Sequence, residues 1–214
     1  MILRRIFYGL ILAGFLIYTL RFAPPDTGHD ATFQELMLGR GLGRNPAIFA
    51  VFNLLGILPL LYWALLFPDG RGQKVWAWPF AFGMMALGSF ALLPYFILRR
   101  PYPVAAPGAP GFWVRWFGSR AFALFADSAL VFLIGYGLVL GDWGDYAYWF
   151  RHSNFINVMT VDLALLALLF PALLTDDLSR RGISGSSPLG RAALFVPIIG
   201  PAIYLVLRRQ EGSL

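Results

Sequence analysis

The chain has no cysteine, only two histidines and few charged residues, and each shortage removes a class of function. Without cysteine there is no disulfide framework, no thiol nucleophile and no thiolate metal site. Charged residues are 13% of the 214 residues and hydrophobic residues are 58%, which leaves too little charge to cover a water-soluble globule. The signatures HExxH and GxSxG and a phosphate-binding glycine loop are also absent from the sequence.

What remains is a hydrophobic and basic chain, with a mean hydropathy of +0.67 and a net charge of +6. In a soluble protein this charge would suggest nucleic acid as a partner. Here the basic residues sit as doublets at the ends of apolar runs, where they anchor helices against anionic headgroups. We therefore predict the lipid bilayer, and no nucleic acid, as the partner.

Six apolar runs predict an all-α, polytopic transmembrane helix bundle that forms a single integral membrane domain over residues 1–214. Prolines inside the runs predict kinked helices, or helix breaks of the kind found in transporters. No internal repeat is predicted. The predicted spans are residues 6–20, 46–67, 75–98, 121–140, 155–174 and 192–207.

Six spans leave the orientation in the membrane undecided. With this topology, seven lysines and arginines fall on the side of the amino terminus and ten on the other side. Cytoplasmic loops carry an excess of such residues, but this difference is too small to choose a side.

Polar residues inside the spans are the candidate functional residues, because a polar group at membrane depth needs a partner or a function. Counting from the side where segments 68–74 and 141–154 both emerge, Asn53, Ser89 and Asp127 each lie about 20 Å deep at 1.5 Å per residue. We therefore predict one intramembrane polar layer in which Asn53 donates its amide to Asp127, with Ser89 nearby. This layer is either interhelical packing or a relay for protons or substrate.

A second polar site is predicted around Asn157, Thr160 and Asp162. Asn154, Asn157 and Thr160 step by three and form one stripe of a helix, whereas Asp162 lies about 140° from Asn157 around it. The stripe either packs against a neighbouring helix or opens a small polar pocket toward His152. His152 itself lies at a predicted membrane surface and is a possible axial ligand for a tetrapyrrole pigment.

An acidic pair, Asp176 and Asp177, lies in "TDDLSRRG" at the end of the fifth predicted span. It is similar to half of the aspartate-rich magnesium motif of membrane prenyltransferases, but the required second motif is absent. We interpret it as a solvated helix end and predict no metal site.

The strings "PDGRGQKVWAWPF" and "FALLPYFILRR" within residues 52–101 resemble a family of small multi-pass membrane proteins from cyanobacteria and plant chloroplasts. Members carry similar "PDGKGQKVPAWPF" and "FALLPYFALR" strings, and "FINVMTVDLALLALLFPALLTDDLSRRG" is similar to their later helix. Trp76 departs from the family pattern, which often has proline there. The resemblance implies a photosynthetic membrane, either a thylakoid or a bacterial cytoplasmic membrane, and assigns no reaction.

Two functions follow as hypotheses. The first is a non-enzymatic accessory, assembly or pigment- and lipid-contacting subunit of a photosynthetic complex. Its partners would be photosystem or antenna subunits, and chlorophyll or carotenoid its cofactor. The second is a small proton- or solute-handling transporter, or a membrane enzyme acting on an isoprenoid-like substrate, with Asp127 and Asp162 as ionisable centres.

Overall fold

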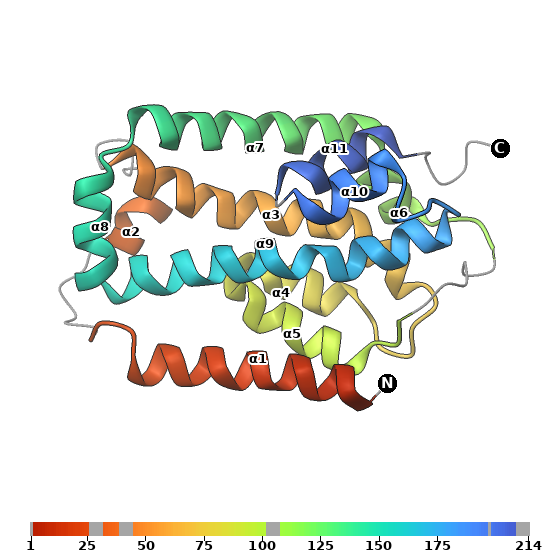
Figure 1. Cartoon of the computed structure of the whole chain (residues 1–214), viewed down its shortest axis with the longest axis horizontal. Helices are drawn as coiled ribbons and strands as arrows, with labels where there is room; N and C mark the ends of the chain where they lie inside the picture. The colour runs from red at the N-terminus through yellow and green to blue at the C-terminus, as the bar shows by residue number, and fades with distance from the viewer. Residues whose placement is uncertain (1, 26–31, 39–44, 102–107, 197, 209–214) are drawn as a thin grey trace.

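The structure is a computed structural model, and it describes residues 2–25, 32–38, 45–101, 108–196 and 198–208. These residues form α-helices and no strand, so the all-α prediction is confirmed for this part of the chain. Figure 1 shows them as a bundle of long helices lying nearly side by side. The helices are α1 Ile2–Arg21, α2 Thr32–Met37, α3 Pro46–Gly70, α4 Trp78–Leu87, α5 Ser89–Leu98, α6 Phe112–Phe117, α7 Arg120–Leu140, α8 Trp143–His152, α9 Asn154–Arg180, α10 Pro188–Phe195 and α11 Ile199–Leu207.

Four of these helices, α1, α3, α7 and α9, are long and apolar enough to cross a membrane. They have 20 to 27 residues, so they span about 30–40 Å at 1.5 Å per residue, which matches the hydrocarbon core of a bilayer. The chain is therefore built as an integral membrane protein. The prediction of about six spans is not confirmed.

The predicted span 75–98 folds back on itself as a helical hairpin, α4–α5. The rings of Phe80 and Tyr95 lie 5.5 Å apart, although fifteen residues of continuous helix would separate them by about 22 Å. Gln73 before the hairpin and Arg100 after it exchange two hydrogen bonds, of 2.6 and 2.7 Å. Both ends of the hairpin therefore lie at the same end of the bundle, and its tip points inward.

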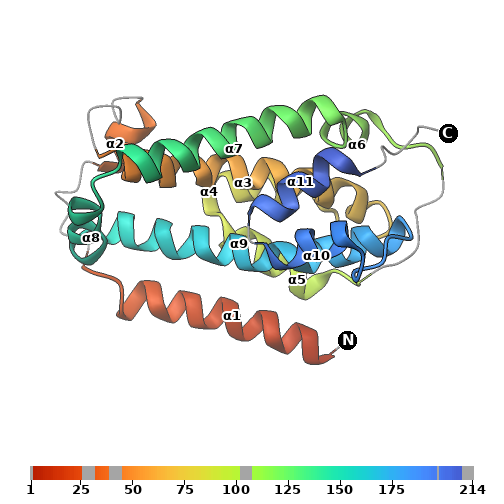
Figure 2. The ribbon, with the colours of Figure 1, turned by 45° about the horizontal axis from the view of Figure 1, so that its top comes forward.

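The predicted span 192–207 is also a hairpin, α10–α11, which turns at Ile198. The hairpin starts at Pro188, seven residues after the final turn of α9, and after it Arg208 returns to bond Asp177 in that same turn. Figures 1 and 2 show that it enters the bundle from the same end as α4–α5. Each of its two helices has fewer than ten residues, about half of what a span needs.

A hairpin returns to the end of the bundle at which it starts, whereas a span crosses to the other end. The two hairpins therefore change which connections lie at the same end. We call the end where α1 begins and α3 ends the basic end, and the other the far end. Among the described residues, the lysines and arginines at the far end are two, Arg21 and Arg151. The other 12 described lysines and arginines belong to the basic end.

The order of elements repeats within the chain. A long helix, a short helix, a second long helix and a hairpin occur as α1, α2, α3, α4–α5 and again as α7, α8, α9, α10–α11. The contacts repeat too: α1 packs on α5 where α7 packs on α11. Arg4 donates to the Arg99 carbonyl at 2.7 Å, and Arg120 to the Val206 carbonyl at 3.1 Å. The prediction that the chain has no internal repeat is therefore wrong.

Helices α3 and α9 pack on each other at the centre of the bundle, and each of them contacts both hairpins. Side chains of α3 such as Leu58, Leu61 and Leu65 are completely buried. In contrast, only Tyr8 and Phe15 of α1 are buried, so most of α1 presents its apolar side chains to the bilayer.

Candidate functional site

The tip of the α4–α5 hairpin is held by a carboxylate from another helix. Asp162 of α9 accepts two hydrogen bonds on Oδ1, one from the Ser89 amide at 2.8 Å and one from the Ser89 hydroxyl. Ser89 is the first residue of α5, and the start of a helix has unpaired N–H groups and a partial positive charge. Asp162 thus caps α5 from outside the helix.

Gly88 makes this cap possible. Its φ of +51° turns the chain between α4 and α5, a conformation that favours glycine. A Cβ at this position would lie 1.7 Å from Asp162 Oδ2, so any side chain would displace the carboxylate. Asp162 lies about 12 Å along α9 from the far end, at 1.5 Å per residue.

Two adjacent cavities of about 530 and 440 Å³ meet at Asp162. The larger one extends to His152 and Asn154 at the far end of the bundle, and Asn53 lines the smaller one. Asp162 is only 8% exposed, although it borders both cavities. Residues that line both cavities are Phe33, Leu55, Ala86, Phe155 and Asp162.

The predicted pairing of Asn53 with Asp127 is wrong. The Asn53 amide donates to the Phe49 carbonyl of its own helix at 2.8 Å, and Ser89 bonds Asp162 instead. Asp127 Oδ1 is buried with no hydrogen-bond partner among the described residues. The depth count failed because the hairpin puts segments 68–74 and 141–154 at opposite ends, so Asn53 shares a level with Asp162 and not with Asp127.

The polar stripe of α9 packs against neighbouring helices. Asn157 accepts a hydrogen bond from the Tyr18 hydroxyl at 2.7 Å and donates to the Phe150 carbonyl at 2.9 Å. Thr160 shares a hydrogen bond with the Tyr146 hydroxyl at 2.6 Å. The stripe therefore joins α9 to α1 and α8, and the pocket near His152 is bordered by Asp162.

His152 is exposed at the mouth of the larger cavity. A ring nitrogen lies 2.7 Å from the Tyr148 carbonyl, and the two rings stack with centroids 4.2 Å apart. The position is open enough for a ligand, as the pigment hypothesis requires.

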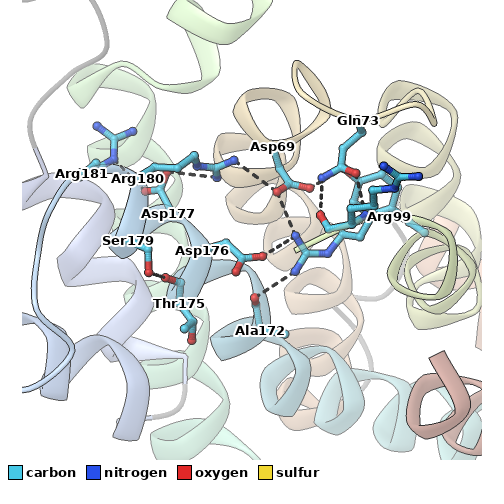
Figure 3. A network of polar contacts seen from close by, with 12 residues as sticks. Asp69, Gln73, Arg99, Ala172, Thr175, Asp176, Asp177, Ser179, Arg180 and Arg181 are labelled. Carbon is cyan, nitrogen blue, oxygen red and sulfur yellow. Dashed lines mark hydrogen bonds and ion pairs between the residues drawn. The ribbon is translucent and has the colours of Figure 1, made fainter. Parts of the chain in front are cut away.

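A buried ion-pair network closes the basic end, and its first half centres on Asp69 (Figure 3). Asp69 accepts hydrogen bonds from the Tyr95 hydroxyl at 2.6 Å and from the Arg99 guanidinium at 2.9 Å. Arg99 also pairs with Asp176 at 2.7 Å and donates to the Ala172 carbonyl of α9 at 3.1 Å. The α4–α5 hairpin is thus tied to both central helices.

The second half of the network repeats this arrangement around Asp177. Asp177 accepts hydrogen bonds from the Tyr204 hydroxyl at 2.7 Å, from Arg208 at 3.0 Å and from Arg181 at 2.9 Å. Arg208 also donates to the Ala64 carbonyl of α3 at 2.9 Å. The α10–α11 hairpin is therefore tied to both central helices in the same way.

Arg180 joins the two halves, because it lies 3.3 Å from Asp69 and 3.5 Å from Asp177. Burial by itself would lower the pKa of the Arg99 guanidinium, but Asp69 and Asp176 outweigh it and raise that pKa. Asp177 is completely buried, so the interpretation of this acidic pair as a solvated helix end is wrong for Asp177.

The network was missed in the sequence although a signal for it exists. The string Tyr-x-x-Leu-Arg-Arg occurs at residues 95–100 and again at 204–209. An aspartate lies 26 residues before the first tyrosine and 27 residues before the second. Two copies of one tyrosine, arginine and aspartate pattern would have indicated both the repeat and the buried charges.

Comparison of the chain with protein-family models, curated proteins and solved structures found no match. Within the described ranges, no three His, Cys, Asp or Glu side chains group together as a metal site would require. Asp162, the tip of the hairpin and the two cavities are therefore the features from which a function is argued.

Proposed function

We propose that the protein is a small membrane carrier that handles protons or a small solute at Asp162. One observation carries this proposal: a carboxylate within the bundle caps a re-entrant half-helix at the point where two cavities meet. Transporters build their sites from interrupted helices at the interface of structural repeats. The chain has two parallel repeats, and each contains a re-entrant hairpin of two half-helices.

Comparison of equivalent positions in the two repeats shows which residues both repeats share, and Asp162 is not one of them. Asp177 and Asp69 occupy equivalent places and differ by 108 in number, so the equivalent of Asp162 in the first repeat is Leu54. Leu54 is buried and apolar, which shows that the architecture does not need a carboxylate at this level. Because an ionisable group at membrane depth is costly, Asp162 is a candidate for function.

The two ends of the bundle fit one state of an alternating-access cycle. The larger cavity reaches the far end, whereas the network around Asp69 and Asp177 ties the helices together at the basic end. A carrier in this state loads its solute from the far end and must break part of the network to release it at the basic end.

The charge distribution supports an orientation. Cytoplasmic segments carry the excess of lysine and arginine, and among the described residues the basic end has 12 of them against 2. The basic end would then face the cytoplasm or the chloroplast stroma, and the cavity would open to the opposite compartment. By the resemblance, the membrane is a thylakoid or a bacterial cytoplasmic membrane.

The orientation is tested by single-cysteine labelling, which has no background in a chain without cysteine. We expect a membrane-impermeant maleimide to label Tyr148→Cys, exposed at the far end, in intact bacterial cells. Lys74→Cys at the basic end should be labelled only after permeabilisation. The reverse pattern would overturn the orientation.

The carrier function is tested in proteoliposomes that contain the pH dye pyranine. A K⁺ diffusion potential set by valinomycin should drive proton flux with the wild-type protein and not with Asp162→Asn. Asp127→Asn is the matched control, because it removes the other intramembrane carboxylate and should keep the flux. Wild-type flux equal to that of empty liposomes, or full flux with Asp162→Asn, would contradict proton handling at Asp162.

A second candidate is the accessory subunit of a photosynthetic complex, which the apolar outer face of α1 favours. Side chains such as Phe7, Leu10 and Leu20 are more than half exposed there, and they suit another membrane protein or pigment tails as well as lipid. Purification in a gentle detergent should then yield pigment bands and antenna or photosystem chains. If His152 holds the pigment, His152→Ala should lose the bands, and a colourless, solitary protein would reject this candidate.

A further inference from the structure

The charge inside the cavities limits which solutes can bind there. Asp162 is the only carboxylate among the described residues that line them, and no lysine or arginine is among those residues. His152 is the other titratable group, and it lies at the mouth. Among the described residues, a solute that reaches Asp162 therefore meets one carboxylate and no lysine or arginine.

An anionic solute is disfavoured at this site, although the N-terminus of α5 lies beside Asp162. The N-terminus of a helix is an ordinary anion site, but the carboxylate of Asp162 already occupies the start of α5. Both hydrogen bonds from Ser89 end on the same oxygen, Oδ1. Within the described residues Oδ2 makes no further bond, and it is available to a cation in the cavity.

The walls of the cavities are aromatic. Phe33 and Phe155 meet edge to face with centroids 5.2 Å apart, Phe52 lies 6.1 Å from Phe155, and Phe90 borders the larger cavity. Aromatic faces attract cations, and quaternary ammonium groups are bound in this way. A bare metal ion would instead need several oxygen ligands. Among the described lining residues, Asp162 is the one side chain that supplies a carboxylate.

The size of the cavities suits a small organic molecule. The larger one, at about 530 Å³, lies within the range of roughly 300–1,000 Å³ typical of small-molecule sites. We propose that this site binds a small organic ammonium ion, with its cationic group at Asp162 Oδ2 and its alkyl part against Phe33, Phe90 and Phe155. The inference rests on the carrier function proposed above and names its substrate class.

The test is thermal stabilisation of the purified full-length protein by tetramethylammonium chloride. We expect a saturable rise in Tm with this probe, and none with 2,2-dimethylpropanol, a neutral molecule of similar shape, or with sodium chloride at equal ionic strength. Asp162→Asn should abolish the rise and Asp127→Asn should keep it. Phe155→Leu should weaken the apparent affinity about two- to fivefold, the size of one cation–π contact.

An equal rise with the neutral molecule, or with Asp162→Asn, would overturn the ammonium class. No rise with tetramethylammonium would overturn it as well, and proton flux in proteoliposomes then separates the two proposals. Flux that depends on Asp162 without ammonium stabilisation leaves the carrier function standing. Loss of both in a folded wild-type protein contradicts both.

Discussion

The two re-entrant hairpins share their anchors and differ at their tips. In α4–α5, Tyr95 and Arg99 hold the hairpin to an aspartate at the end of α3, and Tyr204 and Arg208 do the same for α10–α11 and α9. The anchors lie at the basic end, where charges can be paired and buried near the membrane surface. The part that both repeats share is thus the set of contacts that holds each hairpin in the bundle.

The tips show where the repeats part. The first hairpin turns at Gly88 and is capped by Asp162 beside a cavity. The second turns at Ile198, whose φ of +65° is unfavourable for a β-branched residue, and α11 has no side-chain cap. This difference between the tips shows that the candidate site belongs to one of the two repeats, although both repeats share the same anchors.

The largest expected effect comes from the anchors. Asp177→Ala leaves Arg208, which is 4% exposed, without its carboxylate, and should lower the free energy of unfolding by about 3–5 kcal/mol. Asp69→Ala should cost less, because Arg99 keeps its ion pair with Asp176. Reversible unfolding in mixed detergent micelles measures both, and a smaller loss for Asp177→Ala than for Asp69→Ala would contradict this order.

The next largest effect should distinguish the tips of the two hairpins. Gly88→Ala places a methyl group on Asp162 Oδ2 at a positive φ, and should cost about 1–3 kcal/mol and abolish proton flux. Ile198→Gly relieves its backbone and should keep the flux. Thermal unfolding and the pyranine assay report the two properties separately. Normal flux with Gly88→Ala would show that the cap has no part in the function.

The smallest effect should be equal in the two repeats. Tyr95→Phe and Tyr204→Phe each remove one hydroxyl that donates to a buried carboxylate and keep the ring, at a cost of about 1–2 kcal/mol. Equal losses of stability would sharpen the comparison of the anchors. A loss confined to Tyr95→Phe would show that only the first hairpin depends on its tyrosine.

The long helices could be predicted from the sequence and the hairpins could not. Apolar length alone places α1, α3, α7 and α9, because hydrophobicity is what a span requires. Length carries no information about direction, so run 75–98, with Gly88 in its interior, predicts a single span and not a hairpin. One such error reverses every later connection, and it misplaced Asp127 relative to Asn53.

The burial of charged side chains at the basic end is the other feature that was not predicted from the sequence. Asp69, Arg99 and Asp177 stand at the ends of apolar runs, where solvent and headgroups normally satisfy them. The hairpins cover this surface in the folded chain and bury these charges. Asp162 was recognised beforehand, because a carboxylate inside a span needs no tertiary structure to be conspicuous.

The crossed anchors have a consequence for biosynthesis. Arg99 of the first repeat donates to the Ala172 carbonyl in the second, and Arg208 of the second donates to the Ala64 carbonyl in the first. Neither repeat can therefore complete its polar contacts alone while the chain is inserted segment by segment. Arg99 can pair with Asp69 of its own repeat early, but its contacts with Asp176 and the Ala172 carbonyl form only when α9 arrives. Completion of the first half therefore waits for synthesis of the second.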